Sequence, residues 1–116
     1  MAITIQTKNG KIKISNEAVA SIAGGATIKS AGVISMSAKN VFRDYSSTVL
    51  HRQNYARGIL VSTKNDQLNI EIHLIARLGT KLSEVAKSVK QNVEYEIKNH
   101  LGLTVNDVKI VVDEAK

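Results

Sequence analysis

The sequence contains no cysteine and no proline, and only 3% of its 116 residues are aromatic. Without cysteine the chain has neither a disulfide framework nor a thiolate metal site, which is compatible with a reducing cytoplasm. The lack of proline and of low-complexity runs argues against a linker or a disordered tail. No stretch approaches the roughly 18 consecutive apolar residues of a membrane span, and the alternating N-terminal residues do not form a secretory signal. We therefore expect one soluble globular domain over residues 1–116.

Positive charge is distributed unevenly along the chain. The formal net charge is +6 at pH 7. Residues 1–57 hold eight Lys and Arg residues against two acidic residues, Glu17 and Asp44, whereas residues 58–116 hold eight of each. The excess positive charge thus belongs to the first half, where it could meet phosphate groups of nucleic acid or of anionic lipid.

Two segments show the alternation that is typical of a hairpin. Residues 3–14 place isoleucines at alternate positions on either side of an Asn9-Gly10 pair, which suits the positive φ values of a tight turn. A second hairpin is predicted from residues 59–63 and 68–76. Its return strand has one mostly polar face, expected to be wet, and one apolar face, expected to be buried. The apolar face comprises Leu68, Ile70, Ile72, Leu74 and Ala76.

A first long helix is predicted after the first hairpin. It begins at Ser15 or Asn16, either of which can cap free N–H groups, and it ends before Gly32. Gly24 and Gly25 fall inside it, where each costs about 1 kcal/mol relative to alanine. We expect this cost to be tolerated because another backbone lies close to the pair. The apolar stripe of this helix contains Val19, Ile22, Ala23 and Ala26.

A second, longer helix opens at Thr80 or Ser83 and is ended by Gly102. Short strands are predicted over residues 33–36 and 108–112. Together these elements predict an α+β fold of two layers, in which a mostly antiparallel sheet carries the two long helices on one face. The apolar stripe of the second helix contains Leu82, Val85, Ala86, Val89, Val93 and Ile97.

Ile75 and Val111 interrupt the polar face of the predicted sheet. Two interpretations are open. A short helix, predicted over residues 41–53, could cover both side chains. Alternatively, the two residues belong to a self-association surface.

No constellation of residues indicates catalysis. The three histidines, His51, His73 and His100, lie in different predicted elements. His73 and Glu71 share the wet strand face, but without a visible third ligand we interpret them as a surface pair rather than a metal site. His100 is expected to act as a cation in the last helical turn. No serine stands at a recognisable motif spacing from a histidine, and no phosphate-binding glycine loop is present, so neither an enzyme nor a cofactor is predicted.

The basic first half allows a polyanion-binding surface. Phe42, Tyr45 and Tyr55 interleave with its arginines, as stacking residues would, but Phe42 and Tyr45 also belong to the apolar stripe of the predicted 41–53 helix. We favour solvation, or docking to an acidic partner, because the charges are spread over several elements and nucleic-acid motifs are lacking. The candidate surface comprises Lys11, Lys13, Arg43, Arg52 and Arg57.

Several motifs together resemble the alkaline-shock-protein family, and within it the YloU-like branch. They are ISNEA followed by AGG at residues 14–25, GVISMSAKN at 32–40, NYARGILVST at 54–63, and the run from GTKLSEVAKSVKQ to VKIVV at 79–112. The resemblance covers nearly the whole chain and keeps the order and spacing of its elements.

This resemblance implies a small α+β cytoplasmic protein of Gram-positive bacteria that has no known catalytic residues, self-associates and is linked to envelope stress. It also implies possible partners: a separate membrane-anchor protein, or a fatty-acid kinase of the dihydroxyacetone-kinase-like type. We expect no long polar extensions of the kind that is common in the family. The sequence therefore predicts a non-enzymatic, self-associating scaffold or regulatory partner near the cell envelope, with an RNA- or lipid-binding module as the alternative.

Overall fold

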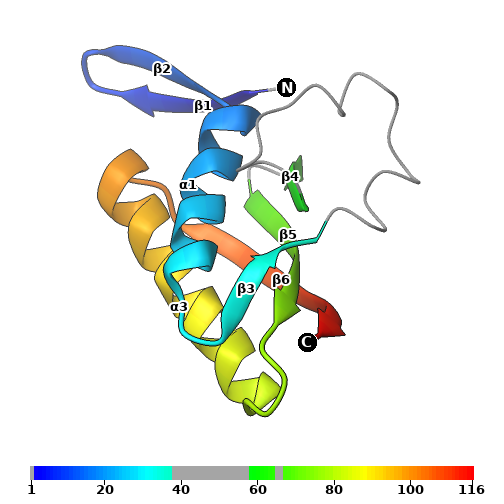
Figure 1. The fold of residues 1–116 in the computed structure, drawn as a ribbon. Coiled ribbons are helices and arrows are strands. Elements are labelled where there is room, and N and C mark those ends of the chain that lie inside the picture. Colours follow the sequence, from blue (N-terminus) through cyan, green and yellow to red (C-terminus); the bar gives the residue numbers. More distant parts are fainter. Residues whose placement is uncertain (1, 38–57, 65–66) are drawn as a thin grey trace, which may run out of the picture.

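The computed structural model describes residues 2–37, 58–64 and 67–116. The helices α1 and α3 lie side by side on one face of a four-stranded sheet, which gives the two-layer α+β fold predicted from the sequence (Figure 1). The predicted 41–53 helix falls outside the described residues. In chain order the elements are β1 (Ala2–Thr7), β2 (Gly10–Ser15), α1 (Asn16–Lys29), β3 (Val33–Met36), β4 (Ile59–Lys64), β5 (Gln67–Ala76), α3 (Leu82–Leu101) and β6 (Val105–Ala115).

Strand β5 is the centre of the main sheet. Strand β6 pairs with it in parallel along nearly its whole length, after the crossover through α3. Two further strands pair with β5 in the antiparallel direction. Strand β4 pairs with residues 67–72 of β5, and β3 pairs with its residues 74–76. Since β6 occupies one edge of β5, β3 and β4 share the other edge, end to end. They meet at His73, whose N–H donates to Gly58 O (2.7 Å) and whose carbonyl accepts from Ser37 N (2.9 Å).

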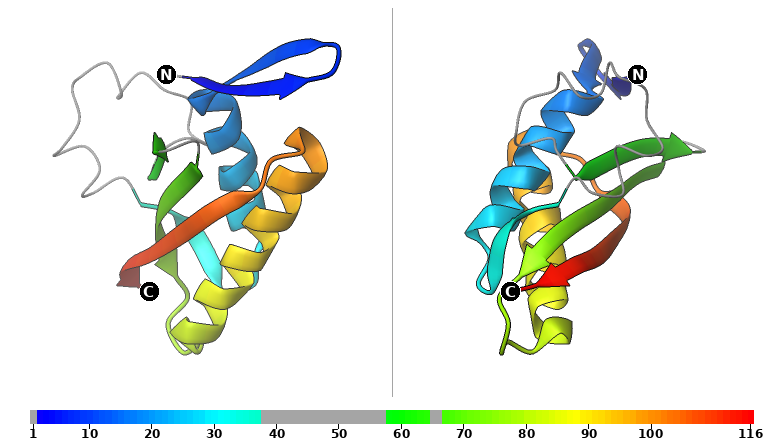
Figure 2. Two further views of the ribbon diagram at one scale, coloured as in Figure 1. Left: turned by 180° about the vertical axis from the view of Figure 1, so that it is seen from behind. Right: turned by 45° about the vertical axis from the view of Figure 1, so that its right-hand side comes forward.

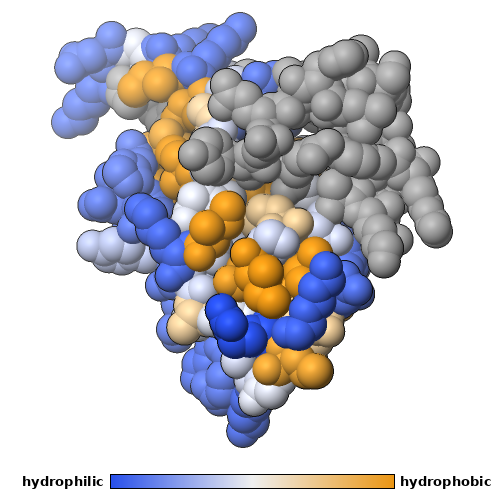
Figure 3. Space-filling view, viewed as in Figure 1, coloured by the Kyte–Doolittle hydropathy of each residue, from blue (hydrophilic) through white to orange (hydrophobic). Residues whose placement is uncertain are grey.

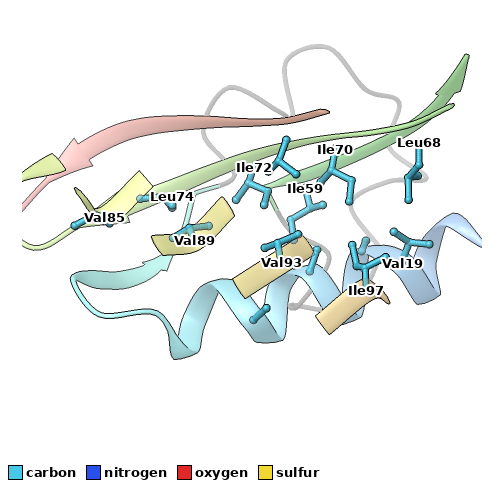
Figure 4. Close-up of a cluster of buried hydrophobic side chains, with 14 of the residues drawn as sticks. Val19, Ile59, Leu68, Ile70, Ile72, Leu74, Val85, Val89, Val93 and Ile97 are labelled. Atoms are coloured by element: carbon cyan, nitrogen blue, oxygen red, sulfur yellow. The ribbon is translucent and has the colours of Figure 1, made fainter. Parts of the chain in front are cut away.

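The core lies between the sheet and the helices (Figure 4). The predicted apolar face of β5 is buried, and four positions of the α3 stripe point toward it. From α1, three of the four predicted stripe residues are buried, whereas Ile22 is half-buried. Leu82 was expected in the core, but it is 41% exposed because it stands in the first turn of α3, beyond the end of the packed region. The buried α3 residues are Val85, Val89, Val93 and Ile97.

Two element ends differ from the sequence prediction. Thr7 pairs with Gly10, so the first hairpin turns at Lys8 and Asn9 rather than at Asn9 and Gly10. The helix α3 is capped by Lys81, without a side-chain hydrogen bond, instead of by Thr80 or Ser83. The Thr80 hydroxyl donates instead to the Arg77 carbonyl (2.6 Å), which stabilises the preceding turn.

Glycine packing also differs from the prediction. A Cβ added at Gly25 would meet nothing within 4 Å, so the expectation of a close backbone there is wrong. Gly25 lines a shallow hollow between α1 and α3, whereas its neighbour Gly24 is buried. A close approach occurs instead at Gly32, where φ is +85° and an added Cβ would come within 2.6 Å of the Val85 side chain. The turn after α1 therefore packs directly against α3.

Replacing Gly25 with alanine is expected to raise the free energy of unfolding by about 0.5–1 kcal/mol. Alanine favours the helix by about that amount, and the added methyl group meets no neighbour. Urea denaturation measures the change. The matched substitution Gly32→Ala should instead destabilise the domain, because it combines a positive φ with overlap against a core valine. A Gly25→Ala protein that is less stable than wild type would contradict the open environment of Gly25.

Candidate functional site on the open face of the sheet

The face of the sheet opposite the helices holds a histidine between two carboxylates. His73 Nε2 lies 2.6 Å from Glu71 Oε2, and His73 Nδ1 lies 3.2 Å from Asp113 Oδ2. The His73 and Asp113 side chains are only 9% and 4% exposed, whereas Glu71 is 32% exposed. The predicted pairing with Glu71 is confirmed, but the wet environment expected for His73 is wrong.

Asp113 is the member of this cluster that the sequence analysis missed. It comes from β6, 40 residues after His73. The register of β5 and β6 shifts between the pairs Leu74–Val112 and Ile75–Glu114, so Asp113 is the extra residue of a bulge, and its carboxylate reaches the imidazole. The alternation of apolar and polar residues in β6 places Asp113 on the polar face of the sheet. Its contact with His73 depends in addition on the pairing of β6 with β5 and on the register of that pairing.

The hydrogen bonding of the cluster limits its chemistry. Each of the two ring nitrogens of His73 lies within hydrogen-bond distance of a different carboxylate. Both ring nitrogens are thus already occupied, which leaves neither for activating a nucleophile or binding a metal. Within residues 2–37, 58–64 and 67–116, no group of three His, Asp or Glu side chains is arranged to hold a metal ion.

Further polar contacts extend the cluster along β5 and β6. Lys109 Nζ lies 3.8 Å from Glu71 Oε1, and Asn106 Nδ2 donates to Asn69 Oδ1 (3.0 Å). A shallow hollow of about 270 Å³ lies beside them, with walls that include Leu60, Ser62, Asn69, Glu71, Asp107 and Lys109. The mixed charges of this hollow do not single out one ligand class.

The two candidate self-association residues lie on this open face. Val111 pairs with His73, and Ile75 pairs with Ser35 and with Glu114. Both are half-buried, while Ile34 on β3 is 42% exposed. Figure 3 shows hydrophobic groups on the side that carries β3, separated by hydrophilic side chains. Whether residues 41–53 cover Ile75 and Val111 lies outside the described part of the chain.

The structure places only part of the candidate basic surface. Lys11 and Lys13 are exposed on β2, whereas Arg43, Arg52 and Arg57 lie outside the described residues, as does His51. His100 stands in the last turn of α3, as predicted, with its Nε2 2.8 Å from Glu96 Oε2. The described basic residues of the first half are therefore concentrated on the first hairpin.

Comparison with known proteins identifies the family. Residues 4–116 match the alkaline-shock-protein family, which is described as having a cell envelope-related function. The chain belongs to the alkaline-shock-protein family. It is 39% identical over 112 residues to the uncharacterized protein YloU of Bacillus subtilis (strain 168), covering 97% of this chain and 93% of YloU. This similarity supports the YloU-like branch predicted from the sequence.

Two further relatives extend the comparison within the alkaline-shock-protein family. The uncharacterized protein Spy1614 of Streptococcus pyogenes serotype M6 (strain ATCC BAA-946 / MGAS10394) is 30% identical over 116 residues, which is 100% of this chain and 96% of the relative. The uncharacterized protein YqhY of Bacillus subtilis (strain 168) is 27% identical over 107 residues, or 90% and 76% of the two chains. No solved structure matches significantly. Among the described residues of this family member, no helix is long and apolar enough to cross a membrane.

Proposed function

We propose that this alkaline-shock-family protein is non-enzymatic and acts through its surfaces, as a self-associating scaffold or regulatory partner in an envelope-related process. The open sheet face carries this proposal. There the half-buried apolar residues Ile75 and Val111 lie beside a histidine whose two nitrogens are both hydrogen-bonded. Such a face offers contact area, while both nitrogens of its histidine are already engaged. The family's cell envelope-related function agrees with this role.

The family resemblance provides the setting for this proposal. The protein would act in the cytoplasm and reach the envelope through a partner, such as a membrane-anchor protein. A fatty-acid kinase of the dihydroxyacetone-kinase-like type is the other partner suggested by the resemblance. If such a partner binds through Ile75 and Val111, it would compete for the open face with a second copy of this chain.

Sedimentation velocity over a range of protein concentrations tests the self-association. Wild type is expected to sediment as a species heavier than the 12.6 kDa monomer, and Ile75→Lys or Val111→Lys is expected to shift it toward the monomer. A charged side chain at the centre of an interface would lose its hydration without gaining a partner.

Tyr95→Lys is a matched control, since Tyr95 is 66% exposed on α3, in the helix layer. It introduces the same charge away from the open face and should leave the association unchanged. Circular dichroism establishes that each variant retains its fold. A monomeric wild type, or equal effects of all three substitutions, would contradict the proposed surface.

A further inference from the structure

The hairpin β1–β2 is a separate sheet that projects from the body of the molecule (Figures 1 and 2). It does not pair with the four-stranded sheet. Its junction with the body is nevertheless fixed, because Ser15 ends β2 and also caps α1, accepting a hydrogen bond from Ala18 N (3.1 Å). The hairpin is therefore a directed arm at the N-terminal end of α1.

Two kinds of side chain distinguish this arm. Lys8, Lys11 and Lys13 are all exposed, and residues 2–15 contain no acidic residue. Within the described part of the chain, no ion pair involves these three lysines. In contrast, Ile14 packs against the core, while Ile12, two residues nearer the turn, is 50% exposed. The arm thus presents both positive charge and apolar area beyond the edge of the core.

The combination of exposed lysines with an exposed isoleucine favours one class of anionic partner over another. A nucleic acid would use the lysines, but single-stranded nucleic acid is bound on aromatic platforms, and residues 1–15 contain no aromatic residue. An anionic bilayer surface uses both features, since its phosphates attract lysines while the boundary between headgroups and acyl chains accepts an isoleucine. Lys11 and Lys13 alternate with Ile12 along β2, so their side chains leave the opposite face of the hairpin. The hairpin would therefore meet the surface along its edge, where the flexible lysine stems can extend toward the phosphates while Ile12 enters the interface.

We propose that the β1–β2 hairpin is a contact site for an anionic phospholipid surface, with Lys8, Lys11 and Lys13 binding the headgroup phosphates and Ile12 entering the interface. This inference goes beyond the proposed scaffold function and does not depend on self-association through the open sheet face. The arm would bring the chain directly to a membrane surface. Because three lysines and one isoleucine give weak attachment on their own, the contact should be reversible and sensitive to salt.

Vesicle flotation tests the proposal, with phosphatidylglycerol–phosphatidylcholine vesicles compared against phosphatidylcholine alone. Wild type should float with the anionic vesicles at about 50 mM salt and largely dissociate at about 500 mM. Replacing all three hairpin lysines by glutamine should lower the partition constant by roughly fivefold per lysine. Ile12→Ser should lower it further, without changing the net charge.

The matched control removes three exposed lysines from α3, by Lys87→Gln, Lys90→Gln and Lys98→Gln. It has the same net charge as the hairpin variant and should retain most of the vesicle binding. Equal losses in the two variants would overturn the proposal, since they would show an effect of net charge alone. Absence of wild-type flotation at low salt would also overturn it, as would tighter binding to single-stranded RNA that depends on the same three lysines. Sedimentation of the hairpin variant, expected to match wild type, keeps this result separate from self-association.

Discussion

Replacing Gly58 with alanine is expected to lower the free energy of unfolding by about 3 kcal/mol or more. Gly58 has a φ of +81°, which L side chains rarely adopt. An added Cβ would overlap the carbonyl oxygen of Ser37 and lie 2.8 Å from that of His73. Neither group can rotate away like a flexible side chain, because both belong to the backbone and the Ser37 N–H is bonded to His73. Chemical denaturation, followed by circular dichroism, measures the loss.

The suitable control is Gly79→Ala. Gly79 has a φ of +93°, but an added Cβ there would meet nothing within 4 Å. Its substitution should therefore cost only about 1 kcal/mol, from backbone strain alone. The difference between the two variants isolates the packing at the point where β3 ends and β4 begins. Equal costs would show that the two strand ends do not meet closely at His73.

The architecture could be predicted because its main signals are local. The period of two in β5 and the three- and four-residue spacing in α3 each define a buried face without reference to the rest of the chain. Gly102 likewise marks the end of α3 through a left-handed conformation with a φ of +71° that glycine adopts at little cost. These features led directly to a layer of helices on one face of a sheet.

The features that the sequence analysis missed depend on contacts between distant segments. Asp113 reaches the His73 ring because a bulge in β6 shifts the register there, and no local pattern specifies that register. Gly32, rather than Gly25, meets a neighbour because the turn after α1 packs on Val85, which is distant in the sequence. The open sheet face is therefore where prediction failed most, since its side chains come from strands that are far apart along the chain.

Substituting Val93 by aspartate is expected to unfold the domain. Val93 is 0% exposed, and its side chain points from α3 into the core toward β5 (Figure 4). Loss of the valine removes about 1.5–3 kcal/mol of apolar burial, and the carboxylate must then be buried without a partner or protonated. Together these costs approach the total stability of a small domain, about 5–15 kcal/mol. Loss of the folded far-ultraviolet circular dichroism signal and of cooperative urea unfolding would show the effect.

Lys90→Asp places the same side chain in the same helix, three residues earlier, at an exposed position. It should cost no more than about 1 kcal/mol, which includes its lower helix propensity and its repulsion with Glu94 one turn later. Since the introduced residue and the helix are shared, the difference between the two variants measures the burial of the Val93 face. If both proteins unfolded at the same urea concentration, α3 would not present this face to β5, and the two-layer packing would have to be reassigned.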